Sequence, residues 1–443
     1  MNHPRKVFLI SLGCSKNLVD SESILGLLHD RGIRSAQTLE EADMVIINTC
    51  GFIQSAVEES IDTILEVSNK KKKGEIDYLF VVGCFVQRYG YKLSKEIPEV
   101  DGWLGTGELD KIPMLIQDHE SPPLFFISRP TALADHTTSR IQTTPFYTAY
   151  LRIAEGCSHR CSYCIIPALR GPFRSRTLES LAIEAKRLID HGVKEINIIA
   201  QDTTMYGRDL KSHPTLITLL ENLLLIKGLD WIRIFYCHPV GVSDQLLSLL
   251  GSEEALCPYI DIPFQHVNPM ILRSMGRDVQ KEDPRILIEK IRSLKRDISI
   301  RTTLMVGFPG ETDEIFDELH EFVSTASFDH MGAFIFSPEK GTPAARMQDI
   351  PDKKVAKKRL DNLMKLQRRI SKEKNRSLIG RTLPVLIEGV SEETDLLLSG
   401  RTAAMAPDVD ARVLINKGEG IVGEFSMVRI TEAYPYDLVG EIV

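Results

Sequence analysis

The sequence lacks the features that would direct it to a membrane or to nucleic acid as a whole. No run of about 18 apolar residues occurs in the 443-residue chain, so no membrane-spanning helix is predicted. The apolar run near the start, Val7 to Leu12, is interrupted by Ser11 and is too short for a secretory signal. Positive charge is not in excess, because 54 Lys and Arg stand against 61 Asp and Glu, a net charge of −7. We therefore expect a cytoplasmic protein that has no membrane anchor, and any contact with RNA must be local.

The composition is otherwise that of a folded protein. Hydrophobic residues make up 43% and charged residues 26%, both typical of soluble globular chains. A length of 443 residues predicts roughly two to four domains. The chain has eight cysteines. Because disulfides are rare in a reducing cytoplasm, these thiols are predicted to be ligands or catalysts.

Three cysteines stand close together in the segment CSHRCSYC, residues 157–164. Cys157, Cys161 and Cys164 are separated by three and then two residues. A closed zinc site needs four ligands, whereas an iron–sulfur cluster held by three thiolates leaves one iron open for a substrate or cofactor. The spacing favours such a cluster. The alternatives are a zinc loop completed by His159 or a distant ligand, and ordinary thiols.

A second set of thiols follows from the pattern of residues 6–100. Three β-rich runs, each followed by a helical pattern, predict a parallel sheet covered by helices. The runs VFLISLGC, DMVIINTC and YLFVVGC end at Cys14, Cys50 and Cys84. Since the carboxyl ends of parallel strands meet at one edge, we expect these thiols to come together and to hold a second cluster. The alternative is that each cysteine simply ends a buried strand as a small hydrophobic residue.

The pattern loosens between residues 101 and 143, where SPP and SRPTALADHTT predict a linker or an extended crossover. Strand and helix patterns return over 144–337 and predict six β/α units, which fit a barrel or part of one. The CSHRCSYC loop leaves the first of these strands, where a barrel places its active site. The six predicted strands are YTAYLRIAEGC, EINIIAQD, WIRIFYCHP, YIDIPFQH, IRTTLMVGF and MGAFIFS.

The last hundred residues divide into a basic helix and a β-rich tail. The predicted helix 352–376 has eleven basic and three acidic residues; a docked helix with a solvated basic side is favoured, and contact with an anionic surface stays open. Five β-rich runs over 377–443 predict a small barrel. That barrel has five basic and eleven acidic residues, a net charge of −6. It is therefore better suited to a basic protein than to a phosphate backbone.

Taken together, these segments resemble a known enzyme family. The three thiols of CSHRCSYC, with Tyr163 before the last, are similar to the signature of radical S-adenosylmethionine enzymes. The segments SLGCSKNLVDSE, NTCGF and VGCFVQR, with the terminal barrel, resemble the methylthiotransferase family along essentially the whole chain. The resemblance implies an α/β architecture with a flavodoxin- or Rossmann-like N-terminal domain (5–120), a linker (121–143), a partial TIM-like (β/α)6 radical core (144–376) and a TRAM-like β-barrel (377–443).

The resemblance also implies the chemistry. Cys157, Cys161 and Cys164 would hold a 4Fe-4S cluster that binds and reductively cleaves S-adenosylmethionine, giving a radical that takes hydrogen from an aspartate β-carbon. A second 4Fe-4S cluster, on Cys14 and the two other N-terminal thiols, would deliver a methylated sulfur. The segments are most similar to enzymes that modify small-subunit ribosomal protein twelve. The alternatives are a modified adenosine in tRNA as substrate, or a zinc-stabilised RNA-binding protein without redox chemistry. A flavodoxin or ferredoxin is the expected reductant, and RNA contact is possible but not required.

Other positions are weaker candidates. Tyr163 is expected beside the adenine of S-adenosylmethionine, with simple packing as the alternative. The resemblance places Gly307, Gly310 and Glu311 of the loop GFPGET near the same cofactor, while a plain turn before a helix is the alternative. Three arginines near the thiol loop could bind a carboxylate or lie on the surface. Four polar residues at predicted strands are further candidates. Two cysteines outside the triads and two histidines are expected to be structural. These are, in turn, Arg170, Arg174 and Arg176; Gln201, Asp202, Gln265 and Arg301; and Cys237, Cys257, His238 and His266.

Overall fold

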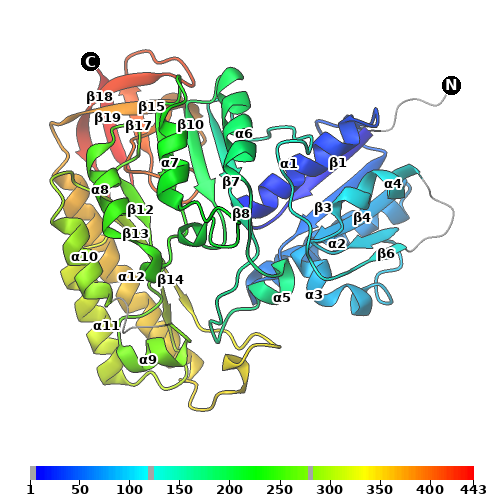
Figure 1. Cartoon of the computed structure of the whole chain (residues 1–443), viewed down its shortest axis with the longest axis horizontal. Coiled ribbons are helices and arrows are strands. Elements are labelled where there is room, and N and C mark those ends of the chain that lie inside the picture. The colour runs from blue at the N-terminus through cyan, green and yellow to red at the C-terminus, as the bar shows by residue number, and fades with distance from the viewer. Residues whose placement is uncertain (1–5, 118–123, 278–282) are drawn as a thin grey trace.

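The computed structural model describes residues 6–117, 124–277 and 283–443. Three units follow one another along the chain: a sheet covered by helices, a larger central domain of parallel strands, and a small β-barrel (Figure 1). No helix in the described ranges is long and apolar enough to cross a membrane. Residues 121–123 of the predicted linker lie outside the described residues.

The N-terminal domain is a six-stranded parallel sheet in the order β2-β1-β3-β4-β5-β6. Its buried residues form one core on each face, with α1 and α4 on one side and α2 and α3 on the other. The predicted flavodoxin-like class is confirmed, and the strand order reverses between β1 and β3, where such sheets bind ligands. The elements are β1 (Lys6–Ser11), α1 (Ser15–His29), β2 (Arg34–Ser35), β3 (Met44–Thr49), α2 (Gln54–Lys72), β4 (Tyr78–Gly83), α3 (Cys84–Leu93), β5 (Gly102–Leu104), α4 (Ile112–Gln117) and β6 (Leu124–Phe126).

The predicted start of the linker needs a correction. Residues 124–126 form β6, which pairs with β5, so the sheet continues beyond residue 121. Each of these strands has three residues, too few for an alternating pattern to be visible in the sequence. The segment that appeared loose from residue 101 onward is therefore partly the edge of the sheet.

The central domain contains all six predicted strands. They form two parallel three-stranded sheets, β11-β10-β7 and β12-β13-β14, joined by an isolated bridge between Ile232 and Leu256. Helices pack around the outside, and one large apolar core lies between them and the strands. The prediction of a partial barrel is confirmed. The strands are β7 (Thr148–Arg152), β10 (Glu195–Ile199), β11 (Trp231–Ile234), β12 (Tyr259–Asp261), β13 (Ser299–Val306) and β14 (His330–Ile335), with a short antiparallel pair β8 (Ala154–Glu155) and β9 (Arg174–Ser175).

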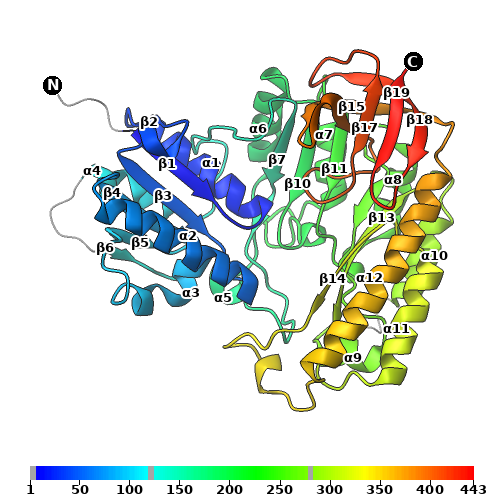
Figure 2. The same ribbon diagram turned by 180° about the vertical axis from the view of Figure 1, so that it is seen from behind.

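The helices of the central domain are α5 (Ile166–Arg170), α6 (Leu178–Asp190), α7 (Leu216–Leu224), α8 (Asp244–Ser252), α9 (Pro269–Ser274), α10 (Pro284–Arg292), α11 (Asp313–Ala326) and α12 (Lys353–Arg376). The basic segment is α12, which lies along the outside and leads up to the barrel (Figure 2). Asp352 caps its N-terminus, and Ala356, Leu363 and Ile370 are buried. The predicted docked helix is confirmed.

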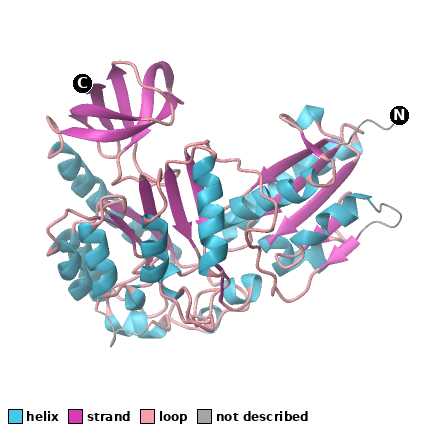
Figure 3. Ribbon diagram, turned by 45° about the horizontal axis from the view of Figure 1, so that its top comes forward, coloured by secondary structure: helices cyan, strands magenta, loops and turns pink. Residues whose placement is uncertain are grey.

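The tail folds as a closed barrel in the order β15-β16-β17-β19-β18. Figure 3 shows it as a separate bundle of strands above the central domain. Its five strands coincide with the five predicted runs, and their inward residues form a core of their own. The strands are β15 (Thr382–Ser391), β16 (Thr394–Arg401), β17 (Val413–Lys417), β18 (Phe425–Ala433) and β19 (Leu438–Ile442).

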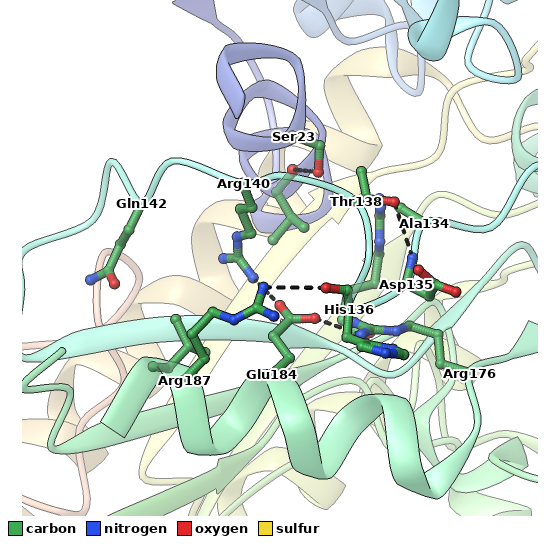
Figure 4. Close-up of a pocket in the computed structure, with 13 residues that line it drawn as sticks. Ser23, Ala134, Asp135, His136, Thr138, Arg140, Gln142, Arg176, Glu184 and Arg187 are labelled. Atoms are coloured by element: carbon green, nitrogen blue, oxygen red, sulfur yellow. Dashed lines mark hydrogen bonds and ion pairs between the residues drawn. The ribbon is translucent and has the colours of Figure 1, made fainter. Parts of the chain in front are cut away.

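A strap of chain, residues 134–143, passes between α1 and α6 and ties the first two domains together (Figure 4). Arg140 forms ion pairs with Glu22 of α1 and, at 2.7 Å, with Glu184 of α6. Glu184 also pairs with Arg176 at 2.6 Å, and the figure shows it lying between the two arginines. Because each end of this chain of charges belongs to a different domain, the strap holds the domains in one relative orientation.

Candidate functional site

All six predicted ligand cysteines line a single cavity of about 370 Å³ between the N-terminal and central domains. Cys14, Cys50 and Cys84 stand directly before α1, directly after β3 and at the first residue of α3. The strands before these thiols, β1, β3 and β4, are neighbours in the sheet. The geometry of a parallel sheet thus brings together thiols that are 36 and 34 residues apart in the sequence.

The second triad lies on the loop between β8 and α5. Backbone contacts fix this loop, because the Cys157 N–H donates to the Gly171 carbonyl at 3.1 Å and the Cys164 N–H to the Cys161 carbonyl at 3.1 Å. Gly156, just before the loop, has φ +75°, and a Cβ there would meet the backbone of Gly171 and Pro172. Only glycine fits this turn, which directs the loop into the cavity.

Arg170, six residues after Cys164, connects the two triads. Its Nε donates to the Cys84 sulfur at 3.2 Å, and Nη1 donates to Asp20 at 2.6 Å. A second arginine, Arg152, also pairs with Asp20, so two guanidinium groups share one carboxylate of α1. All these groups are buried. The helix that follows the loop of one triad is therefore bonded directly to a thiol of the other.

The other two arginines named from the sequence do not line the cavity. Arg174 donates to the carbonyls of Ala132 and Pro172, and Arg176 pairs with Glu184 beneath the strap. The three arginines are close in sequence but leave the loop in different directions.

The thiols suit a metal–sulfur group better than free cysteines. None of the six forms a disulfide. Burial raises the pKa of Cys84 to about 12, although Arg170 opposes the shift, and burial also raises the pKa of Cys164 to about 12 and that of Cys157 to about 11. Thiols so strongly protonated are inert alone, whereas coordination to a metal removes the proton. Three thiols on each side also match a four-iron cluster with one open iron.

His159 is not placed as the fourth ligand of a zinc site. Its Nε2 lies 2.6 Å from Asp202, and its ring stacks on His238 with 4.2 Å between centroids. In the part of the chain that the structure describes, no three His, Cys, Asp or Glu side chains converge closely enough for one ion. Neither triad is therefore a preformed site for a single metal. His238, which stacks on His159, also lines the cavity.

The softer predictions divide into two groups. Tyr163 lines the cavity beside the second triad, and so do the four polar strand residues, Gln201, Asp202, Gln265 and Arg301. The loop residues Gly307, Gly310 and Glu311 do not. Glu311 is buried and accepts from the Gly307 N–H at 3.0 Å and from Arg359 of α12 at 2.7 Å. A Cβ at Gly307 would approach Ala356, so in this structure the loop serves contact with α12.

Sequence reasoning missed several residues of the cavity wall. Lys16 and Asn17 lie in the first turn of α1, two and three residues after Cys14. Tyr236 stands two residues after β11, and Asp261 is the last residue of β12. Position could have indicated them, because Tyr236 and Asp261 lie at or just after the carboxyl end of a strand and Lys16 and Asn17 are close in sequence to a predicted ligand. Arg277 also lines the cavity, and its guanidinium donates to the Pro263 carbonyl at 2.6 Å.

Comparison with known proteins gives this arrangement a family. Three family models match: uncharacterized protein family UPF0004 over residues 6–105, the radical SAM superfamily over 151–323 and the TRAM domain over 379–443. The ribosomal protein uS12 methylthiotransferase RimO of Geobacter sulfurreducens is 47% identical over 444 residues, covering 100% of this chain and 99% of the relative. This chain belongs to the uS12 methylthiotransferase family.

Other members of the family and solved structures agree. The RimO proteins of Geotalea uraniireducens and Myxococcus xanthus are 48% and 44% identical, each over 99% of this chain and over 98% and 92% of their own length. The radical S-adenosylmethionine methyltransferase TsrM from Kitasatospora setae has a TM-score of 0.55 at 17% identity, with 77% of each chain covered. The radical enzyme OxsB has a TM-score of 0.50 at 12% identity, covering 82% of this chain and 56% of its own. At these identities the two structures show the shared fold alone.

Proposed function

We propose that the chain transfers a methylthio group to the β-carbon of an aspartate in ribosomal protein uS12, using S-adenosylmethionine and two 4Fe-4S clusters. The observation that carries this proposal is the single cavity lined by six thiols from two domains. Relatives with this activity in their name match the chain from end to end. We divide the work among an N-terminal domain that ends with β6 at Phe126, a linker from there to residue 143, a radical domain (144–376) and a terminal barrel (377–443).

Each triad has its own part in this proposal. Cys157, Cys161 and Cys164 would hold the cluster that binds S-adenosylmethionine, and Tyr163 would lie by its adenine. The thiols of the N-terminal sheet, Cys14, Cys50 and Cys84, would hold the auxiliary cluster. When bound, these groups supply the reducing electron, the radical chemistry, the sulfur and the methyl group. A small one-electron carrier, a flavodoxin or ferredoxin, would provide the electrons.

The chain itself supplies position and charge. Arg170, at the end of the helix after the second triad, is bonded to Cys84 of the first triad and to Asp20, so that both triads face the same cavity. His159 is held against Asp202, which in turn accepts from the Thr204 N–H at 2.9 Å, so this wall of the cavity is rigid. The protein thereby brings the reacting groups together in one cavity.

The barrel would face the basic ribosomal substrate and its RNA. Part of its negative charge is used internally, since Glu388 pairs with Arg401 and Asp410 with Arg301. Glu393 at the turn between β15 and β16 and Asp395 at the start of β16 are exposed and could attract a basic protein, as could Glu392, which also pairs with Arg412 at 3.2 Å. The lysines of α12 that face outward would serve local RNA contacts. We place the enzyme in the cytoplasm, with its substrate.

The test is reconstitution without oxygen followed by mass measurement. We expect about eight irons per chain, four for each cluster, and a gain by uS12 of one methylthio group in place of one hydrogen. Cys161→Ala should abolish reductive cleavage of S-adenosylmethionine, whereas Cys50→Ala should spare cleavage and stop sulfur transfer. Methylthiolation of tRNA with none of uS12 would refute the substrate. A colourless zinc protein that does not react with dithionite would refute the chemistry.

A further inference from the structure

Lys16 is a buried lysine whose ammonium has no carboxylate partner among the described residues. It is 8% exposed and lines the cavity shared by the two thiol triads. Among the arginines there, Arg170 pairs with Asp20, Arg301 pairs with Asp261 at 3.3 Å, and Arg277 donates to the carbonyls of Pro263 and Phe264. An ammonium taken out of water is costly unless an anion accompanies it. The site is therefore incomplete until an anion enters the cavity.

The ammonium is held in place by a strained aromatic residue. Nζ of Lys16 lies 3.1 Å from the centroid of the Tyr236 ring, a cation–π contact between the two domains. Tyr236 has φ +56°, a left-handed conformation that aromatic residues rarely adopt. Its N–H donates to Asp261 at 3.0 Å, and its hydroxyl lies 3.5 Å from the Ser15 Oγ. Backbone strain of this kind is maintained where a side chain must be aimed at a site.

We propose, on the basis of the function proposed above, that Lys16 binds the side-chain carboxylate of the substrate aspartate. Lys16 stands two residues after Cys14 and its ammonium reaches the ring at the end of β11, so it lies where both domains border the cavity. In aspartate the carboxylate is bonded directly to the β-carbon that reacts. An ammonium that holds the carboxylate therefore also places that carbon. Lys16 would thus distinguish an acidic side chain from a neutral one.

The test compares two substrates with two enzymes. Binding of uS12, and of uS12 with the modified aspartate replaced by asparagine, is measured with reconstituted wild type and with Lys16→Met, which keeps the length of the side chain but removes its charge. Wild type should bind the aspartate form more tightly than the asparagine form. Lys16→Met should weaken binding of the aspartate form by roughly 10- to 100-fold, the range for hydrogen bonds to charged groups. Binding of the asparagine form should change little. Lys16→Arg should restore part of the preference, and Lys186→Met, on the exposed side of α6, should leave it unchanged.

Three results would overturn the proposal. Lys16→Met could weaken both forms of uS12 equally, which would make Lys16 a structural residue. Lys16→Met could instead weaken the binding of S-adenosylmethionine, which would assign the ammonium to the cofactor's carboxylate. It could lose iron or change the electron paramagnetic resonance signal of either cluster, which would assign Lys16 to cluster assembly. Failure of the proposed function is visible separately, as wild-type enzyme that binds uS12 without methylthiolating it.

Discussion

The central domain contacts the N-terminal domain through one buried network of ion pairs and the barrel through another. Only one of these two networks lies next to the thiol cavity. Toward the N-terminal domain, Arg170 and Arg152 share Asp20, and Arg170 also contacts the Cys84 thiol. Toward the barrel, Arg401 and Arg233 share Glu195, whose side chain is fully buried. Both networks place two guanidinium groups on one carboxylate. The first borders the cavity and bonds to one of its thiols, whereas the second does neither among the described residues.

The two interfaces therefore have different roles: the first positions the reacting groups, and the second holds the domains together. Buried ion pairs contribute little net stability compared with apolar contacts, but breaking one is costly, so they enforce one arrangement. At the first interface the enforced arrangement is the relation between two sets of thiols. At the second it is the position of the barrel. The barrel reaches the cavity indirectly, because Asp410 pairs at 3.3 Å with Arg301, a residue of the cavity wall.

Removing Arg170 should have the largest effect. Arg170→Met leaves Asp20 with one guanidinium instead of two and Cys84 without its donor, and we expect a loss of about 3–5 kcal/mol in the free energy of unfolding. Sulfur transfer should fall by more than the cleavage of S-adenosylmethionine, since the relation between the triads is disturbed. The midpoint potential of the auxiliary cluster should fall, because hydrogen bonds to cluster sulfur influence the potential.

Arg170→Lys serves as the control, because it keeps a charge near Asp20 but cannot donate to Asp20, Asn17 and Cys84 together. It should recover stability more fully than sulfur transfer. If Arg170→Met left both the potential and the ratio of transfer to cleavage unchanged, the distinction between the two interfaces would be lost.

Arg401→Met probes the second interface with the same type of change. Glu195 keeps Arg233 at 3.0 Å, so we expect a loss at the lower end of about 3–5 kcal/mol in the free energy of unfolding. Iron content and the ratio of sulfur transfer to cofactor cleavage should match wild type. Urea unfolding measures the stability, iron analysis measures the iron content, and assays of sulfur transfer and of cofactor cleavage give their ratio. A selective loss of sulfur transfer in this variant would show that the barrel interface also positions the chemistry.

The pH dependence of stability offers a smaller effect at the same interface. Burial alone would raise the pKa of Glu195, but Arg401 and Arg233 outweigh it and lower the pKa from 4.5 to about 2. A lowered pKa stabilises the folded state above the unfolded value, so this contribution is complete above pH 4.5 and disappears toward pH 2. We expect the stability difference between wild type and Glu195→Gln to shrink on acidification, by about 3 kcal/mol in all. Urea unfolding of the metal-free proteins from pH 7 downward tests this. A constant difference would contradict it.

The sequence predicts strands and helices on both sides of each interface, but it does not predict which residues pair across the interface. Strand patterns located β1, β3 and β4 and hence the meeting of their thiols, because the edge geometry of a parallel sheet follows from local pattern alone. The pairing of Arg170 with Asp20 joins residues 150 positions apart, and nothing local indicates it. Strands β5 and β6 were missed for a different reason, since three residues do not reveal a period.

The same limit applies to the cavity. The cysteines are visible because their spacing is unusual. The family resemblance places the loop 307–311 near the cofactor, while its residues alone also fit a turn before a helix. In the structure this loop contacts α12 through Arg359 and lies next to Ala356, which no local pattern indicates. Lys16 and Tyr236 are ordinary residues in the sequence. Only the meeting of two domains makes them neighbours.

The smallest expected effect concerns the strap at the first interface. A Cβ on Gly26 would come within 2.5 Å of the Arg140 nitrogen, and this neighbour is backbone, which cannot simply rotate away. Gly26→Ala should gain about 1 kcal/mol from helix propensity and lose about 1–3 kcal/mol to overpacking, a net loss of about 1 kcal/mol. Gly332→Ala in β14 is the matched control, because a Cβ there meets nothing within 4 Å, and its stability should stay level or rise slightly. Because the strap holds the two domains in one relative orientation, Gly26→Ala should also reduce sulfur transfer relative to cofactor cleavage. Gly332→Ala should leave this ratio unchanged. Equal transfer ratios in the two variants would mean that Arg170 alone, without the strap, fixes the relation between the triads.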